Sequence, residues 1–341
     1  MTGDGAKIGS RRMRRVPWSA ILAVVVIGAL GLLAYQSRHE VLAALALLRG
    51  AQPVWLAAAL LLVIAGFVCA GQIYGRVLAA LGHRASVLWL SGTALVAILI
   101  NQALPGGSVA AYAFLVASLR RRGFPVASVA MVAGTELLSW NGAVLIAFGY
   151  GLIYLIATHG LTGASVSYGA AGLALLITGA LLYAGSRPDA TLHRWGLWLK
   201  GIVNRAFGPI WTQPQVAQVV DEIVASRRML LEQPGRMAVL VVLQLLVFAC
   251  HSLALLAILT GLGVAVTAPV VGAAYGLALI VSTFVVLPGG GGAVETALAV
   301  ALGVQGVPTE AAIGAAVVFR LLSFWLLLPF GVVLSRRLTR R

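Results

Sequence analysis

Three charged residues lie within stretches of the chain that are otherwise apolar: Glu136, Glu295 and Arg320. If these stretches span a bilayer, each charge costs about 2.5–3.5 kcal/mol unless it is paired or hydrated. The planar guanidinium of Arg320 suits bidentate contacts with a phosphate. The Glu295 carboxylate suits a cationic group or a proton, or it caps the N–H groups at the start of its own helix.

Glu136 and Arg320 follow Pro125 and Pro308, respectively, by nearly the same number of residues. At 1.5 Å per residue, each side chain would lie about 16–18 Å along its helix, near the midplane of a bilayer. A Glu136–Arg320 ion pair is therefore our hypothesis, either as a link between two parts of the chain or as part of a substrate path.

A Leu-Pro-Gly-Gly motif occurs twice, as Leu104-Pro105-Gly106-Gly107 and as Leu287-Pro288-Gly289-Gly290. Proline removes a backbone donor and glycine permits unusual backbone angles, so each motif predicts a broken helix. A helix that starts at such a break has unpaired N–H groups and a partial positive charge, which can hold a phosphate. The breaks either line a substrate path or cap buried re-entrant hairpins. Asn101 and Gln102 precede the first break and are expected to satisfy backbone groups there.

Few other residues suggest chemistry. Gln244 and His251 share one face of an apolar run, where a lone histidine is more often a hydrogen-bonded structural residue than a ligand. The sequence contains no hydrolase, metalloprotease or nucleotide-binding motif. Its two cysteines lie in apolar runs and provide no zinc site. We therefore expect no catalytic residue, metal, cofactor or nucleic-acid partner.

The composition predicts an all-α polytopic membrane protein. Of 341 residues, 61% are apolar and only 10% are charged, whereas a soluble domain has about a quarter charged residues. Runs long enough to span lie at 17–36, 53–80, 86–103, 126–157, 164–184, 236–262, 266–287 and 309–333. Two shorter runs, 108–119 and 292–303, predict re-entrant helices, giving about eight spanning helices plus two re-entrant ones.

The placement of Lys and Arg predicts the orientation. With the N-terminus in the cytoplasm, 21 of the 24 Lys and Arg residues lie on the cytoplasmic side, Arg38 and Arg49 lie on the outer side, and Arg320 lies within a span. This predicts a cell-membrane protein with both termini cytoplasmic. The expected segments are a basic N-terminus (1–16), a first transmembrane half (17–184), a connector (185–235), a second half (236–335) and a basic tail (336–341).

The connector contains an amphipathic helix over 191–207. One face carries Leu192, Trp195, Trp198, Leu199 and Ile202, and the other carries His193, Arg194, Lys200, Asn204 and Arg205. Such a helix suits the headgroup plane of a membrane, or it simply connects the two halves.

The two motifs lie 183 residues apart, and other residues recur at nearly that spacing. The pairs are Leu115 with Leu298, Leu119 with Leu302, Gly123 with Gly306, Pro125 with Pro308 and Pro53 with Arg236, and, at 184, Glu136-Leu137-Leu138-Ser139 with Arg320-Leu321-Leu322-Ser323. The turn at 120–123 is basic, which favours the cytoplasm, whereas the equivalent turn at 303–306 has no charge. We therefore expect two inverted repeats, an arrangement typical of transporters with midplane sites at discontinuous helices.

Several of these residues also resemble a known family. The break at Pro288-Gly289-Gly290, the following Glu295, Gly306-Val307-Pro308 and the stretch from Arg320 to Trp325 resemble the lysylphosphatidylglycerol synthase transmembrane-region family. The resemblance covers about 17–335, and Asn101, the first break and Glu136 match in the first half. The family often has arginines where this chain has Ala110-Ala111-Tyr112 and Leu137.

The resemblance implies that the protein moves an anionic or aminoacylated phospholipid between leaflets. The path would include Asn101, both breaks, Glu136, Glu295 and Arg320. No aminoacyl-transferase domain follows the last span, so enzyme activity is not expected. Membrane lipids are the implied partners, and a separate lipid synthase or glycosyltransferase is a further candidate. The alternatives are a carrier of polyprenyl-phosphate-linked sugars and a non-transporting partner of such an enzyme.

Overall fold

The computed structural model describes residues 50–103, 107–159, 187–207, 234–284 and 293–339, with a few more between 213 and 224. The predicted spans 17–36 and 164–184, and most of both Leu-Pro-Gly-Gly motifs, lie outside the described residues. Every element described in full is helical: α3 (Pro53–Ala80), α4 (Val87–Ala103), α5 (Gly107–Arg121), α6 (Val126–His159), α8 (Asp189–Phe207), α10 (Pro234–Gly261), α11 (Ala268–Phe284), α12 (Ala293–Val304), α13 (Thr309–Arg320), η2 (Leu321–Trp325) and α14 (Leu328–Thr339).

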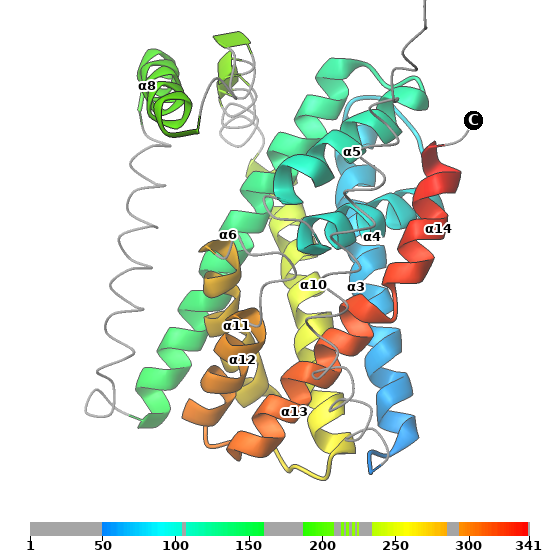
Figure 1. Ribbon diagram of the computed structural model, residues 1–341, viewed down its shortest axis with the longest axis vertical. Coiled ribbons are helices and arrows are strands. Elements are labelled where there is room, and N and C mark those ends of the chain that lie inside the picture. The colour runs from blue at the N-terminus through cyan, green and yellow to red at the C-terminus, as the bar shows by residue number, and fades with distance from the viewer. Residues whose placement is uncertain are drawn as a thin grey trace, which may run out of the picture.

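Among the described residues, four apolar stretches are long enough to cross a bilayer: Pro53–Ala80, Met131–Thr158, Pro234–Gly261 and Thr309–Leu338. Each has 28 or 30 residues, or more than 40 Å at about 1.5 Å per residue, against a hydrocarbon core of about 30 Å. They form the tall helices in Figure 1. These helices confirm the predicted all-α polytopic membrane fold.

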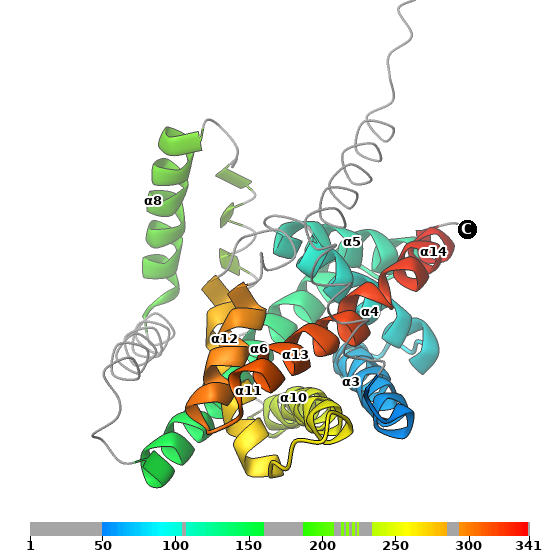
Figure 2. The same cartoon turned by 60° about the horizontal axis from the view of Figure 1, so that its bottom comes forward.

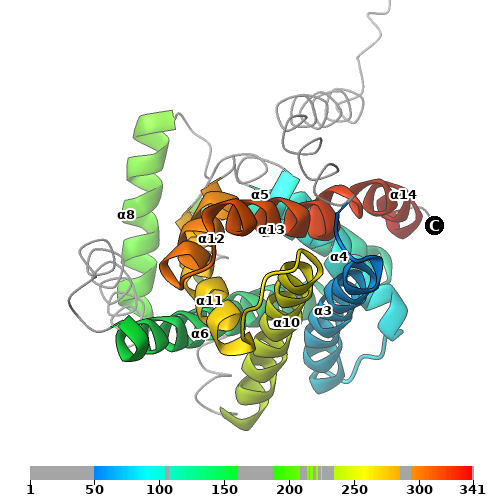
Figure 3. The same ribbon diagram turned by 90° about the horizontal axis from the view of Figure 1, so that it is seen from below.

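The shorter helices pair into two hairpins. The start of α4 lies beside the end of α5, because the Arg122 guanidinium lies 4.7 Å from the Trp89 ring and Phe124 also packs on that ring. Helices α11 and α12 likewise lie side by side (Figures 1 and 3). The runs 86–103 and 266–287, predicted as full-length spans, are 17-residue helices of about 25 Å that turn back instead of crossing alone. The short runs form α5 and α12, as expected for re-entrant helices.

Four left-handed glycines reveal the internal repeat. Gly82 and Gly263 end α3 and α10 with φ of 81° and 79°, and Gly123 and Gly306 follow α5 and α12 with φ of 83° and 88°. The first pair lies 181 residues apart and the second 183. Because α3 and α10 also begin 181 residues apart, Pro53 corresponds to Pro234, which corrects the predicted match to Arg236.

The repeats run in opposite directions. The Gln52 N–H before α3 donates to the Gly261 carbonyl at the end of α10, at 3.1 Å. Figure 1 shows α3 and α10 antiparallel, and α6 antiparallel to the α13–α14 run. The expected inversion is therefore present in the fold.

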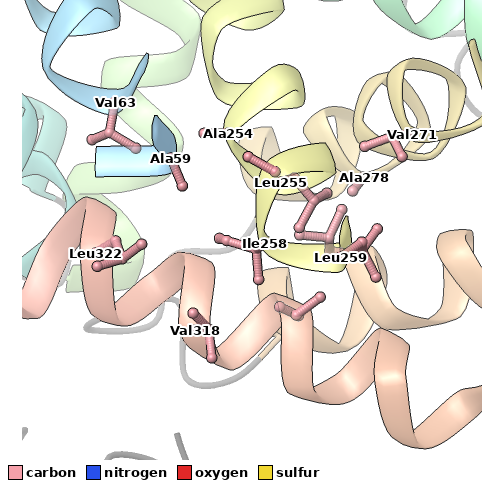
Figure 4. Packing of buried hydrophobic residues seen from close by; sticks show 14 of the residues in the cluster. Ala59, Val63, Ala254, Leu255, Ile258, Leu259, Val271, Ala278, Val318 and Leu322 are labelled. Carbon is pink, nitrogen blue, oxygen red and sulfur yellow. The ribbon is translucent and has the colours of Figure 1, made fainter. Parts of the chain in front are cut away.

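Helices α3 and α10 form the centre of the bundle. A core cluster of small and branched residues joins α3 and α10 to α11, α12 and α13, with Val63, Ile258, Leu259 and Val318 all fully buried (Figure 4). Such residues allow close helix packing in lipid, where van der Waals contact drives association.

The last long helix contains one irregular turn. Between α13 and α14, Leu326 N–H donates to the Leu321 carbonyl at 2.8 Å, five residues back, which makes η2 a π turn. A π turn inserts one residue into an α-helix and often occurs at functional sites. The spacing of the repeat is 183 at Pro308 and already 184 at Arg320, so the change in spacing precedes this turn. Arg320 is the residue immediately before it.

Candidate functional site

Arg320 and Glu295 form an ion pair inside the bundle. The guanidinium Nε lies 3.0 Å from the carboxylate Oε1, and the two side chains are 14% and 13% exposed. Glu295 lies in the first turn of α12, directly after the second break, and Arg320 ends α13. The pair therefore links a re-entrant helix to the irregular turn of a long helix.

A third polar side chain comes from the first half of the molecule. The Arg320 Nη1 donates to Gln102 Oε1 at 2.8 Å. Gln102 is the second-last residue of α4, next to the first break. Described residues next to both motifs, Gln102 and Glu295, therefore meet Arg320 in one polar centre. The sequence predicted that Gln102 satisfies backbone groups at the first motif. Only its position beside that motif indicated that it could contact a residue of the other half.

An aromatic ring supports the guanidinium. The Arg320 Cζ lies 4.4 Å from the centroid of the Phe324 ring. Phe324 is fully buried within η2, so the π turn fixes both the cation and the ring beside it. A cation–π contact of this kind contributes about 0.5–2 kcal/mol.

The ion pair uses only part of the carboxylate. Glu295 Oε2 is buried and has no hydrogen-bond partner among the described residues. A carboxylate can accept about four hydrogen bonds. A buried acceptor without a hydrogen-bond partner lowers the stability of the folded protein by about 1–3 kcal/mol or more. The polar centre therefore combines a paired cation with an unused acceptor for a donor group.

Comparison with known proteins decides the family. The family model for the lysylphosphatidylglycerol synthase TM region matches residues 20–331. The chain belongs to this family. A similar protein is a UPF0104 membrane protein of Methanothermobacter thermautotrophicus, which is 27% identical over 153 residues. That alignment covers 44% of this chain and 45% of the relative, so it spans less than half the length of either. The resemblance drawn from the second break, Glu295 and Arg320 is thereby confirmed.

Glu136 lies apart from the polar centre, on α6. The structure pairs Arg320 with Glu295 on α12, whereas Glu136 lies on α6, which packs against α3, α5, α10 and α11. The predicted Glu136–Arg320 pair is therefore wrong. The positions of Glu136 and Arg320 along their helices predicted similar depths in the membrane. The re-entrant helix α12, however, brings the Glu295 carboxylate to Arg320.

The remaining predicted path residues are only partly described. Asn101 is exposed near the end of α4, and Gly107 is the first residue of α5. Pro105, Gly106, Pro288, Gly289 and Gly290 lie outside the described residues, so their part in a path stays a prediction. Among the residues that are described, no group of three or more His, Cys, Asp and Glu side chains could hold a metal ion.

His251 has the surroundings of a structural residue. Its Nδ1 lies 3.2 Å from the Tyr275 hydroxyl, and its ring packs edge-on against Phe67, Tyr275 and Phe319. A Cβ at Gly66 would lie 2.9 Å from His251 Nε2, so glycine lets α3 approach the imidazole closely. The cluster joins four helices next to Arg320 and supports the polar centre mechanically.

Proposed function

We propose that the protein is a lipid transporter that moves an anionic or aminoacylated phospholipid headgroup between leaflets. One observation carries this proposal: Gln102, Glu295 and Arg320 meet inside the bundle, at the ends of two re-entrant hairpins from inverted halves. The chain belongs to the family of the lysylphosphatidylglycerol synthase TM region, and this membership agrees with a role in lipid metabolism.

The chemistry of the polar centre suits exchange of one anion for another. The ion pair joins the Arg320 Nε to a single carboxylate oxygen of Glu295, which is weaker than a two-bond fork. A lipid phosphate that replaced the carboxylate would keep the buried guanidinium neutralised throughout. The displaced Glu295 would then accept a hydrogen bond from a headgroup hydroxyl or ammonium group. An ammonium group would replace the lost ion pair of Glu295, whereas a hydroxyl would leave the carboxylate charge uncompensated, so the exchange favours an aminoacylated headgroup.

The architecture suits passage of a headgroup while the acyl chains remain in lipid. Inverted repeats with broken helices at their interface are the usual basis of alternating access. In this protein each hairpin enters from its own end of the bundle (Figure 1), so the polar centre lies between two structurally similar gates.

The orientation and partners form part of the same proposal. Arg120 and Arg121 end α5, and Arg336 and Arg337 lie in the last turn of α14 at the same end of the bundle (Figure 1). By the positive-inside rule this end faces the cytoplasm of a cell membrane. The protein would act as a transporter without enzyme activity, on lipids made by a separate synthase.

The test is leaflet exchange in proteoliposomes. Fluorescent phosphatidylglycerol, its lysyl ester and a polyprenyl phosphate would be compared for the wild type, Glu295→Gln and Arg320→Gln. Glu310→Gln and Arg337→Gln are matched controls, because they make the same chemical changes at exposed positions. We expect exchange of one lipid class, lowered at least tenfold in the two core variants and unchanged in the controls. If folded wild-type protein exchanges none of the lipids, the transporter proposal is wrong.

A further inference from the structure

Helix α8 lies across the direction of the spanning helices. Figure 1 shows α8 nearly end-on while α3 and α10 run vertically, and Figure 2 shows it along its length. It lies at the end of the bundle where α5 and α14 finish with their arginines (Figure 1). A helix in this position runs along the membrane surface rather than through it.

The rotation of α8 about its axis is fixed by the connector. Leu192 packs against a small cluster of Val216, Val220 and Val224. On the same side, a Cβ at Gly196 would lie only 2.7 Å from Val220 Cγ2, so the connector rests directly on the helix. His193 Nε2 also lies 3.1 Å from Asp221 Oδ1. These contacts hold one side of α8 away from any other surface.

The opposite side presents a stripe of aromatic and basic residues. Trp198 is 67% exposed, and Trp195, which is 39% exposed, lies at the edge of this side. Arg194, Trp198, Gly201 and Arg205 follow one another at spacings of four, three and four residues, and all four are exposed. These spacings align them along one line of a helix. The stripe thus alternates guanidinium groups with an exposed indole.

We propose that this stripe binds the headgroup layer of the membrane, with the indoles in the interface and the arginines on anionic lipid phosphates. Tryptophan favours the interface because its ring is apolar with one polar N–H. Arginine neighbours add attraction to anionic lipids, and the described part of α8 has one acidic residue, Asp189, at its first turn. The charge of the stripe therefore complements an anionic leaflet and does not depend on the transport proposal.

The consequence concerns how the two halves are joined. The chain passes from the first half to the second through α8 and the segment around 216–224. Binding of α8 to the membrane would hold this connecting segment at the leaflet, and the position of the segment would depend on the charge of the lipids.

A fluorescent label at position 201 provides a direct test. Gly201 lies on the stripe, and a Cβ there meets nothing within 4 Å, so Gly201→Cys keeps both tryptophans and both arginines in place. The full chain, with Cys69→Ser and Cys250→Ala, would be reconstituted in phosphatidylcholine vesicles with or without phosphatidylglycerol. Quenching by headgroup-attached nitroxide lipids would be compared with quenching by aqueous iodide.

We expect lipid quenching to exceed iodide quenching several-fold, and to rise when phosphatidylglycerol is present. Trp195→Ala/Trp198→Ala should reverse the preference, whereas Arg194→Gln/Arg205→Gln should remove only the dependence on phosphatidylglycerol. Arg120→Gln/Arg121→Gln removes the same charges elsewhere at this end and should leave the label unchanged. Iodide quenching equal to that of a free dye would overturn the proposal. Protection from both quenchers would assign the stripe to a protein contact and would overturn it equally.

Discussion

Each half of the molecule packs its long helix against the first hairpin helix of the other half, but the two contacts differ. In one, α11 lies on α6, and Gly276 abuts the backbone carbonyl of Ala147, while a Cβ at Gly151 would lie 2.6 Å from the carbonyl of Ala273. In the other, α14 lies on α4, and a Cβ at Gly92 would lie 3.0 Å from the Leu334 Cδ2 methyl. The first contact joins backbone to backbone, and the second uses side-chain ends that can move. The repeat therefore produces two similar helix–helix contacts, and the contact of α11 with α6 is more rigid than that of α14 with α4.

The charged residues differ between the halves in the same way. Glu136 and Arg320 are related by the repeat, yet α6 is one continuous helix, whereas its counterpart contains a π turn after Arg320. The ion pair lies entirely within the second half, and the first half contributes a neutral amide. The two halves therefore share their helices, but the polar centre contains residues that differ between the halves.

The largest effect is expected from breaking the ion pair. Arg320→Ala would leave Glu295 buried without its cation, which costs about 3–5 kcal/mol of stability. Glu136→Gln, at the related position, should cost far less because no ion pair is lost. Thermal unfolding in detergent would measure both. A double variant, Glu295→Gln/Arg320→Gln, should recover stability relative to Arg320→Gln alone, and simple addition of the two single effects would contradict the pairing.

A second prediction separates the two helix–helix contacts. Gly276→Ala forces a methyl group against a backbone carbonyl and should cost about 1–3 kcal/mol or prevent folding. Gly92→Ala meets a mobile leucine methyl and should cost less than about 1 kcal/mol. The two melting temperatures, with Gly303→Ala as a control at a glycine with open space, would measure the difference. Equal losses at the two contacts would show that they are equally rigid.

A smaller effect tests the equivalence of the turns. Gly123 and Gly306 have positive φ, and a Cβ at either position would meet open space, so alanine there carries a backbone penalty alone. Each substitution should cost about 1 kcal/mol, by nearly equal amounts in the two halves. Denaturation of the single variants would check this, and a large inequality would mean that the turns are not structural counterparts.

The smallest effect concerns the ring beside the guanidinium. Phe324→Leu keeps the residue apolar but removes the cation–π contact, which is worth about 0.5–2 kcal/mol. We expect a small loss of thermal stability that disappears when Arg320 is already replaced by Gln. A full loss in the Arg320→Gln background would indicate that packing alone explains the contribution of Phe324.

The sequence predicted the scaffold better than the polar centre. Apolar run length predicted the helices, and the recurring motifs together with the charges of two turns predicted the inverted repeats, because these features are local in the sequence. Run length also assigned 86–103 and 266–287 as full-length spans, whereas they form the first helices of the two hairpins. The pairing of Arg320 with Glu295 depends on how deeply α12 re-enters and on the direction of its side chains, which no local pattern encodes. The π turn and the role of Gln102 likewise follow from packing between segments that are distant in sequence.

The central claim is that a lipid phosphate competes with Glu295 for Arg320, and retention of phosphatidylglycerol tests it most directly. Detergent-purified wild type, Glu295→Gln and Arg320→Gln would be compared by native mass spectrometry, with Glu310→Gln and Arg337→Gln as controls. We predict several-fold more bound lipid in Glu295→Gln than in the wild type, and almost none in Arg320→Gln. Equal retention in Glu295→Gln and Arg320→Gln would contradict the account.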